Sequence, residues 1–357
     1  MVGTLPAAKT GYQCRGWRGA KITIILFEVW CMLQGVIAGV DLGGTKILTG
    51  LFDEQGRMLA ERLVPTNAAA GLKSVLDRMT SVIEELRQQY APGHKLLGVA
   101  VGAPGPLNSE TGVIYEAPNL RWKDITFREL LQAALQVPVW LDNDANLAAL
   151  GEYTYGYPME HEVLLYLTVS TGIGGGIIIN GMIYRGVDGG AGEFGHMTIM
   201  PGGPVCGCGN QGCLEALASG TAIARAAREE VSRGRLMALC DRVKGRIEEI
   251  DARLVAELAA GGDPEARRIM EEAIGYLGIG VANLVNLFNP RSIVIGGGLS
   301  SYQGLLEQVE EVVKKRAYSS LSRNLRILPA KLGSRAGLMG CLALARLKIT
   351  GSTAGQF

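Results

Sequence analysis

The chain has 357 residues, of which 48% are hydrophobic and 19% charged. This composition is typical of a globular protein that is large enough for two domains. Lys and Arg total 35 against 34 Asp and Glu, so the formal net charge is +1. Such a balance argues against nucleic acid or an anionic membrane as the main partner. The 50 glycines follow no fixed period, which excludes a collagen-like chain.

The first 34 residues fit no domain pattern. Basic residues precede an apolar stretch at 22–33, which contains Glu28 and is too short to span a bilayer. A signal peptide would need the usual three-part pattern, which this segment lacks. We therefore expect residues 1–34 to be an extension that is disordered, or the product of a start codon assigned too early, with Met32 as an alternative start.

Seven cysteines are present, and three of them lie between residues 206 and 213. A disulfide framework would have an even number of cysteines at a wider spacing. The pattern instead favours a reducing compartment, so we expect a cytoplasmic protein with a single metal cluster.

Alternating strand and helix patterns run along the chain. In the first part the predicted strands are 36–40, 47–52, 58–64, 96–101 and 137–141, with a turn at 53–57 and predicted helices at 72–90 and 127–135. In the second part the predicted strands are 163–169, 177–180 and 293–295, and the predicted helices are 214–231, 254–260, 266–288 and 338–347.

A strand, a glycine-rich turn and a second strand occur twice, at 36–52 and at 163–180. Ligands of open α/β sheets bind at the carboxyl ends of the strands, where these turns lie. We therefore predict two α/β domains that face each other across a cleft. The small domain would comprise 35–150 plus 337–350, and the large domain 151–336.

Three glycine-rich turns suit the binding of phosphate. The first, Asp41-Leu-Gly-Gly-Thr-Lys46, offers backbone N–H groups, a hydroxyl and an ammonium, and Asp41 could hold Mg²⁺. It is not a Walker A loop, because Thr45 stands where that motif requires Lys. A tight hairpin turn would explain any one of the three. The other two turns lie at 170–176 and 296–298. Phosphate binding explains the presence of all three turns better than three unrelated hairpins do.

Polar side chains follow the strand at 137–141, in the segment Asp142-Asn-Asp-Ala-Asn146. Helix capping would need only one or two of them. A carboxylate here could be a general base, which must reach the attacking hydroxyl; at its ordinary pKa, about 3.9, an aspartate would be ionised. Glu193 and Glu215 lie in glycine-rich surroundings and suit hydrogen bonds to sugar hydroxyls, although both could be ordinary exposed glutamates.

A metal site is predicted from the segment Cys206-Gly-Cys208-Gly-Asn-Gln-Gly-Cys213, which His196 precedes by ten positions. Three thiolates and one imidazole form a closed tetrahedral zinc site with no open position, so the metal would be structural. The alternative is a set of free buried cysteines. If His196 binds zinc through one nitrogen, its other nitrogen is oriented towards the cleft.

These motifs together resemble the ROK family of repressors and sugar kinases. The stretch from Leu167 to Ile177, continued by Gly192-Glu-Phe-Gly-His196, matches the family signature, and the turn at 41–46 and the cysteine loop at 206–215 match two further family motifs. The similarity extends over about 36–348. It implies an α/β, two-domain hexokinase/actin-like ATPase fold of the ribonuclease H-like type, with a cleft between the domains.

The resemblance also implies a role for individual residues. Asp144, in the Asn143-Asp144 pair, would be the catalytic base. The implied sugar contacts are Gly105, Asn119, Asn143, Glu193, His196 and Glu215, and the implied zinc ligands are His196, Cys206, Cys208 and Cys213. The phosphate turns would supply the nucleotide contacts Asp41, Gly43, Gly44, Thr45, Lys46, Thr171, Gly172, Gly297 and Gly298.

The function that the resemblance implies is an ATP-dependent hexose kinase using Mg²⁺ and structural Zn²⁺. The stretches 119–122 and 213–219 look most like those of glucokinases, so glucose is the expected sugar; fructose, mannose, N-acylmannosamine and allose are alternatives. A sugar-binding ROK repressor is a second hypothesis, but residues 1–34 do not resemble the helix-turn-helix segment of such repressors. Polyphosphate as the donor would favour a basic channel, which the sequence lacks. Family members are usually homodimers or homotetramers.

Overall fold

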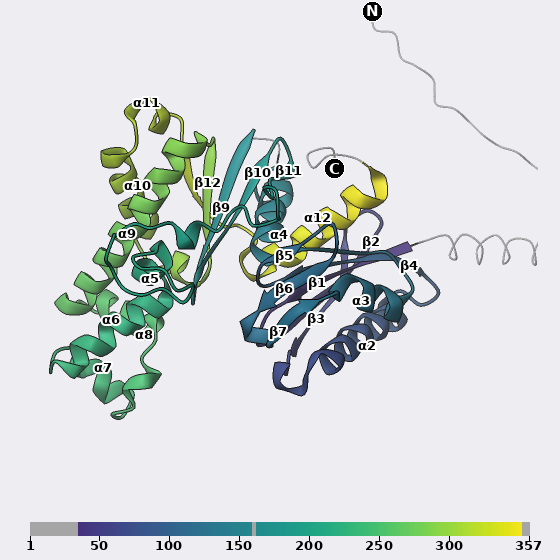
Figure 1. Ribbon diagram of the computed structural model, residues 1–357, viewed down its shortest axis with the longest axis horizontal. Helices are drawn as coiled ribbons and strands as arrows, with labels where there is room; N and C mark the ends of the chain where they lie inside the picture. Colours follow the sequence, from purple (N-terminus) through teal and green to yellow (C-terminus); the bar gives the residue numbers. More distant parts are fainter. Residues whose placement is uncertain (1–34, 159–161, 352–357) are drawn as a thin grey trace, which may run out of the picture.

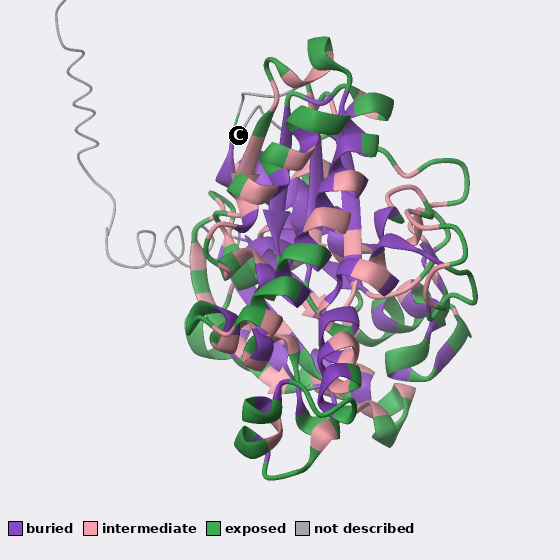
Figure 2. Ribbon diagram, turned by 90° about the vertical axis from the view of Figure 1, so that its left-hand side faces the viewer, coloured by how far each residue is buried: buried purple, intermediate pink, exposed green. Residues whose placement is uncertain are grey.

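The computed structural model of the protein describes residues 35–158 and 162–351, so the expectation for residues 1–34 lies outside the described residues. Two five-stranded sheets lie side by side in Figure 1, with helices α4 (Asp144–Gly151) and α12 (Ala336–Thr350) between them. In Figure 2 the strands and the inner helices are mostly buried, and the exposed residues lie on the outer helices and loops. Within the described ranges, no helix is long and apolar enough to cross a bilayer.

The first sheet has the order β3-β2-β1-β4-β8. Its strands are β1 (Gly35–Leu42), β2 (Lys46–Asp53), β3 (Met58–Pro65), β4 (Lys95–Ala103) and β8 (Val139–Asn143). Helices α2 (Leu72–Tyr90) and α3 (Phe127–Leu135) share one hydrophobic core with this sheet. Because β1, β4 and β8 are mutually parallel, their carboxyl ends meet at one edge of the sheet.

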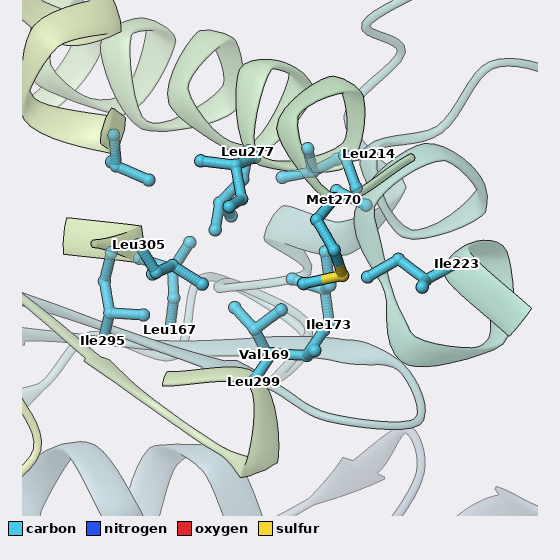
Figure 3. Close-up of a cluster of buried hydrophobic side chains, with 14 of the residues drawn as sticks. Leu167, Val169, Ile173, Leu214, Ile223, Met270, Leu277, Ile295, Leu299 and Leu305 are labelled. Atoms are coloured by element: carbon cyan, nitrogen blue, oxygen red, sulfur yellow. The ribbon is translucent and has the colours of Figure 1, made fainter. Parts of the chain in front are cut away.

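The second sheet has the order β11-β10-β9-β12-β13. Its strands are β9 (Val163–Val169), β10 (Ile173–Ile179), β11 (Met182–Ile183), β12 (Ser292–Gly296) and β13 (Arg326–Pro329). The surrounding helices are α5 (Leu214–Ala218), α6 (Gly220–Ser232), α7 (Met237–Arg242), α8 (Ala252–Ala260), α9 (Pro264–Phe288), α10 (Leu305–Arg316) and α11 (Ser319–Ser322). Figure 3 shows how Leu167 and Ile173 of the sheet pack towards Met270 and Leu277 of α9.

The layer between the sheets depends on glycines that let the backbones approach closely. A Cβ atom on Gly340 of α12 would lie 1.7 Å from the carbonyl oxygen of Leu147 in α4. On the other side of α4, a Cβ on Gly176 of β10 would lie 2.7 Å from the Cβ of Ala149. Since non-bonded atoms cannot approach so closely, both positions require glycine. A third apolar cluster, which includes residues of both sheets and of both helices, fills this layer.

The predicted strands and most of the predicted helices are present, and the strands of the two sheets fall within 35–150 and 151–336, respectively. Two predictions are wrong in detail. The turn predicted at 170–176 is shorter, because Gly174, Gly175 and Gly176 belong to β10. The helix predicted at 214–231 is interrupted at Ser219, whose hydroxyl caps α6 by accepting a hydrogen bond from the N–H of Ala222.

A small third sheet was not predicted. It consists of β5 (Leu107–Asn108), β6 (Val113–Ala117) and β7 (Trp122–Ile125), in the order β5-β6-β7. The strands are short, and β6 and β7 pair with each other rather than with the main sheet. Strand β6 lies next to Gly105, just after β4, since a Cβ on Gly105 would lie 1.9 Å from the carbonyl oxygen of Glu116.

Candidate active site

Two aspartates stand at the shared edge of the first sheet. Asp41 lies near the end of β1, and Asp144 is the first residue of α4, directly after β8. Asp41 and Asp144 both line one pocket of about 450 Å³, together with Gly297 and Gly298, which follow β12 of the second sheet. The predicted phosphate turns 41–46 and 296–298 therefore approach each other across the gap between the sheets.

Asp144 also lines a second, adjoining pocket of about 450 Å³. The predicted sugar contacts in its wall are Gly105, Asn143, Glu193, His196 and Glu215. The wall also contains the turn residues Thr171 and Gly172, which were predicted as nucleotide contacts. Among the charged residues of the two pockets, Asp144 is the one that they share. A group held in one pocket can therefore meet a group held in the other at this carboxylate.

The surroundings of the two aspartates oppose their ionisation. Burial raises the pKa of Asp144 to about 6, and the negative charge of Glu193 adds to this effect, while the N–H of Ala145 partly offsets it. Burial and the charge of Asp144 together raise the pKa of Asp41 to about 7. The value of about 3.9 considered for an unperturbed aspartate therefore does not apply to Asp144. A pKa near 6 keeps this carboxylate mostly ionised at neutral pH and makes it a stronger base.

The position of Asp144 is fixed by the cap of its helix. The side-chain oxygen of Asn143 accepts hydrogen bonds from the N–H groups of Ala145 and Asn146, at 2.9 and 3.2 Å. The side chain of Asn143 is thus the N-cap of α4, and Asp144 occupies the first helical position, where the positive end of the helix dipole favours a carboxylate.

Glu193, His196 and Glu215 lie on the other side of the same pocket. Nε2 of His196 is 3.9 Å from a carboxylate oxygen of Glu193. One oxygen of Glu215 accepts a hydrogen bond from the N–H of Ile173 at 2.8 Å, and the other is 3.9 Å from Sγ of Cys206. Glu215 therefore connects the turn before β10 with the cysteine loop.

The four predicted metal ligands come together. Their ligand atoms all lie within 4.8 Å of one another. Sγ of Cys208 is 3.8 Å from Sγ of Cys213, and Sγ of Cys206 is 3.7 Å from Nδ1 of His196. Zinc–sulfur bonds of about 2.3 Å at tetrahedral angles place two thiolates about 3.8 Å apart. The cluster therefore has the size and the chemistry to hold a structural zinc ion, which His196 would bind through Nδ1, the nitrogen next to Cys206, leaving Nε2 towards Glu193.

Other predicted site residues lie at the edge of this arrangement. Gly43, Thr45 and Lys46 line a third pocket of about 690 Å³. Asp41 lines both this pocket and the pocket that contains Gly297 and Gly298. Gly44 lies against Asn119, since a Cβ on Gly44 would be 2.7 Å from the Cβ of Asn119. Neither Gly44 nor Asn119 lines the three pockets described here.

Some pocket residues were missed by the sequence reasoning. Thr168 lines the same two pockets as Asp144. Ser334 lines the same two pockets as Asp41. Thr168 is the last but one residue of the strand predicted at 163–169, just before a predicted turn, so its position could have been noticed. Ser334 belongs to the loop before α12, and only the tertiary fold brings this loop to Asp41.

The protein has two five-stranded β-sheets flanked by helices, with pockets between them. The strand ends at these pockets carry carboxylates and glycine turns. This arrangement is that of the hexokinase/actin-like ATPase fold. Residues 37–348 match the model of the ROK family, and the chain belongs to this family. It is 37% identical over 320 residues to a glucokinase of Streptomyces coelicolor, covering 88% of this chain and 98% of that protein. The predicted family and fold are thereby confirmed.

Two further relatives show the range of the family. A crystal structure of a ROK family glucokinase from Streptomyces griseus in complex with glucose and AMPPNP has a TM-score of 0.74 and 34% identity, covering 87% of this chain and 99% of that one. A putative xylose repressor of a Caldicellulosiruptor strain is 36% identical over 312 residues, covering 87% of this chain and 78% of that protein. Overall similarity alone therefore does not separate kinase from repressor, and the residues of the site must do so.

Proposed function

We propose that this protein is an ATP-dependent hexose kinase that converts glucose and ATP into glucose 6-phosphate and ADP. The observation that carries the proposal is the position of Asp144 between two adjoining pockets, one with polar sugar-type contacts and the other with glycine turns. The glucokinase relatives favour glucose among the hexoses. As a transferase of this kind it would feed glycolysis.

In the proposed reaction, Asp144 accepts the proton of the sugar hydroxyl as that oxygen attacks the γ-phosphorus of ATP. The transition state of phosphoryl transfer is loose, so the base mainly orients the nucleophile. Asn143, Glu193, His196 and Glu215 would bind the other hydroxyls, together with Gly105 and Asn119. A site that pairs each hydroxyl can discriminate strongly between sugars, since a missing partner leaves a buried polar group unpaired.

The donor phosphates would lie against the turns of both sheets. Gly297 and Gly298 lie opposite Asp41 in one pocket, and Lys46 stands at its side in the neighbouring one. The Mg²⁺ that accompanies ATP would be held near Asp41, whose ionisation is otherwise disfavoured. Gly43, Gly44, Thr45, Thr171 and Gly172 would complete the contacts to the nucleotide.

The cysteine cluster would hold a structural zinc ion that fixes the loop carrying Glu193 and His196, next to Glu215 at the start of α5. Cys206, Cys208, Cys213 and His196 form a complete set of four ligands, so zinc would not act on the substrate.

The cell location and assembly are also proposals. None of the five cysteines in the described ranges forms a disulfide, which suits the reducing cytoplasm. We propose a homodimer or homotetramer, as is usual in the family. We also propose that the ranges 35–150 plus 337–350 and 151–336 are two domains that close on the bound sugar.

One experiment tests the proposed activity directly. Release of ADP is measured with ATP and, in turn, glucose, mannose, fructose, N-acetylmannosamine and allose. We expect turnover with glucose at the highest kcat/KM. A preference for another sugar would replace glucose as the substrate. A protein that binds glucose but releases no ADP would favour the repressor alternative, and turnover with polyphosphate in place of ATP would change the donor.

A further inference from the structure

An ion pair with a buried carboxylate joins the two sheets beside the sugar pocket. Nε and Nη2 of Arg185 both donate to Oδ2 of Asp142, at 2.8 and 2.6 Å. The side chain of Asp142 is only 2% exposed, and that of Arg185 is 30% exposed. Asp142 lies in β8 of the first sheet, and Arg185 follows β11 of the second, 43 positions along the chain. Charge-assisted hydrogen bonds of this kind are stronger than those between neutral groups.

The second oxygen of Asp142 orders the segment that carries the base. Oδ1 accepts a hydrogen bond from the N–H of Asn143 at 2.9 Å and from the side-chain amide of Asn146 at 3.1 Å. Asn143 in turn caps α4, whose first residue is Asp144. The carboxylate of Asp142 is therefore connected on one side to the catalytic segment and on the other to Arg185.

Arg185 also directly precedes the glycine-rich loop 186–192. Its carbonyl oxygen accepts a hydrogen bond from the N–H of Ala191 at 3.0 Å, which closes the loop. The tip reaches the small third sheet, since a Cβ on Gly189 would lie 2.6 Å from the carbonyl oxygen of Leu107. Val187 at the tip is 99% exposed, so little side-chain packing holds the loop in place.

The loop forms part of the wall of the pocket in which Asp144 lies. Gly189, Ala191 and Gly192 line this pocket, and Glu193 follows directly. A glycine-rich loop has a large conformational entropy, so its bound position has to be fixed by contacts at its ends. At one end, Glu193 is followed by the predicted zinc ligand His196. At the other end, the contact is the ion pair of Arg185.

We propose that Arg185 is a positioning residue for the hexose site, acting through Asp142. The ion pair links Asn143, at the end of β8, to the loop that leads to Glu193, and so sets the position of these two sugar contacts relative to each other. The inference rests on the proposed kinase function, because it assigns the pocket to a hexose. It predicts that loss of the ion pair weakens binding of the sugar much more than binding of ATP.

The test compares Arg185→Ala, Arg185→Lys and Asp142→Asn in the full chain. We expect Arg185→Ala to raise KM for glucose by about tenfold or more, because one partner of a buried ion pair is lost, while KM for ATP changes by less than about twofold. Lysine cannot make the two-nitrogen contact, so Arg185→Lys should fall between wild type and Arg185→Ala. Added guanidinium at millimolar concentration should partly restore the KM for glucose in Arg185→Ala but not in Asp142→Asn.

A matched control is Arg268→Ala. Arg268 also places Nε and Nη2 on one carboxylate oxygen, that of Glu265, but it lies on α9, away from the cleft. This variant should leave both KM values unchanged. The double variant Arg185→Ala/Asp142→Asn should raise KM for glucose no more than Arg185→Ala alone does, because the two residues act as one unit.

Two results would overturn the proposal. The first is an unchanged KM for glucose in Arg185→Ala. The second is a parallel loss of stability and of affinity for both substrates with no rescue by guanidinium, which would make the ion pair merely structural. Calorimetric titration of glucose separates this test from the proposed function. If wild type binds glucose without releasing ADP, the kinase proposal fails, and the affinities of the same variants still decide the role of Arg185.

Discussion

At the scale of single residues, the proposed chemistry depends on one carboxylate, Asp144. Its replacement by Asn keeps the size of the side chain and the hydrogen bond from Ala145 but removes the ability to accept a proton. We expect Asp144→Asn to lower kcat by about 10²–10⁴-fold, the usual contribution of a general base, with the affinity for glucose nearly unchanged. Steady-state kinetics and calorimetry check this expectation. Substantial residual turnover would contradict the assignment of the base.

The same variant offers a control for folding. The pKa of Asp144 is about 6 in the folded protein, above its ordinary value of 3.8. Between these values the folded state retains a proton that the unfolded state has released, so stability falls as the pH rises through this window and remains lower above it. Asp144→Asn should therefore be at least as stable as wild type at pH 7.5, and any gain should disappear below pH 4. Thermal unfolding at both pH values tests this prediction.

The raised pKa values also predict how activity depends on pH. The base must be ionised, so kcat/KM for glucose should fall about tenfold per pH unit once the pH drops below the controlling pKa. Asp144 and Asp41 influence each other, with pKa values of about 6 and 7, so the acidic limb belongs to the pair. We expect its midpoint between pH 6 and 7. A midpoint near pH 4 would show that burial does not perturb these groups.

Individual site residues were predictable where a local motif carries them. The cysteine spacing, with His196 ten positions before it, was enough to predict a cluster of four residues that the fold does bring together. The end of a strand was enough to point to Asp144. Arg185 had no such signal, because its partner Asp142 is 43 positions away and only the fold joins them. The pKa of Asp144 could not be predicted either, since it depends on burial and on the charge of Glu193 across the pocket.

At the scale of elements, the cysteine loop between His196 and α5 has little regular structure of its own. Metal bonds would therefore provide most of its order. We expect Cys208→Ser to lower the zinc content from one ion per chain and to lower kcat/KM for glucose strongly, because His196 and Glu215 lose their fixed positions. Elemental analysis and kinetics measure both effects.

The control for the zinc prediction is Cys240→Ser. Cys240 lies in α7, outside the cluster, and is also a free thiol. Its replacement should change neither zinc content nor activity. Full zinc content in Cys208→Ser would rule out Cys208 as a ligand.

Elements were predictable from sequence where they are long and periodic, as for α2 and α9. Gly174, Gly175 and Gly176 were assigned to a turn because a run of glycines usually marks one. They lie in β10, where Phe194 and α4 approach Gly175 and Gly176 too closely for a side chain. The strands β5, β6 and β7 were missed for a different reason. They have two to five residues each, too few for a periodic pattern to emerge.

At the scale of the whole molecule, the chain crosses between the two sheets twice, and these crossings contact each other. The first crossing is the single π-helical turn Glu152–Gly156, which follows α4, and the second is the loop between β13 and α12. The buried carboxylate of Glu152 accepts hydrogen bonds from the N–H groups of Leu332 and Lys331, at 2.8 and 3.1 Å. The hydroxyl of Tyr157 donates to the carbonyl of Pro329 at 2.6 Å.

These contacts lie where relative movement of the two sheets would be concentrated. The loop that Glu152 holds also contains Gly333 and Ser334, which line the pocket opposite Asp41. Glu152→Gln keeps the size of the side chain but places an amide donor against a backbone N–H. We expect it to lower the free energy of unfolding by about 1–3 kcal/mol, the usual cost of an unpaired buried group. Because that loop borders the donor site, KM for ATP should rise more than KM for glucose, the reverse of the effect expected for Arg185→Ala.

Denaturant unfolding and steady-state kinetics of Glu152→Gln measure these two effects. The control is Glu229→Gln on α6, a half-exposed glutamate whose nearest ion-pair contact, to Arg225, is 3.9 Å long. It should match wild type in stability and in both KM values. If Glu152→Gln instead raised both KM values equally, the two crossings would act as one rigid joint. If it changed neither KM nor stability, the contacts of Glu152 would not hold the second crossing in place. The opposite selectivity of Glu152→Gln and Arg185→Ala would show that the two sides of the cleft are positioned independently.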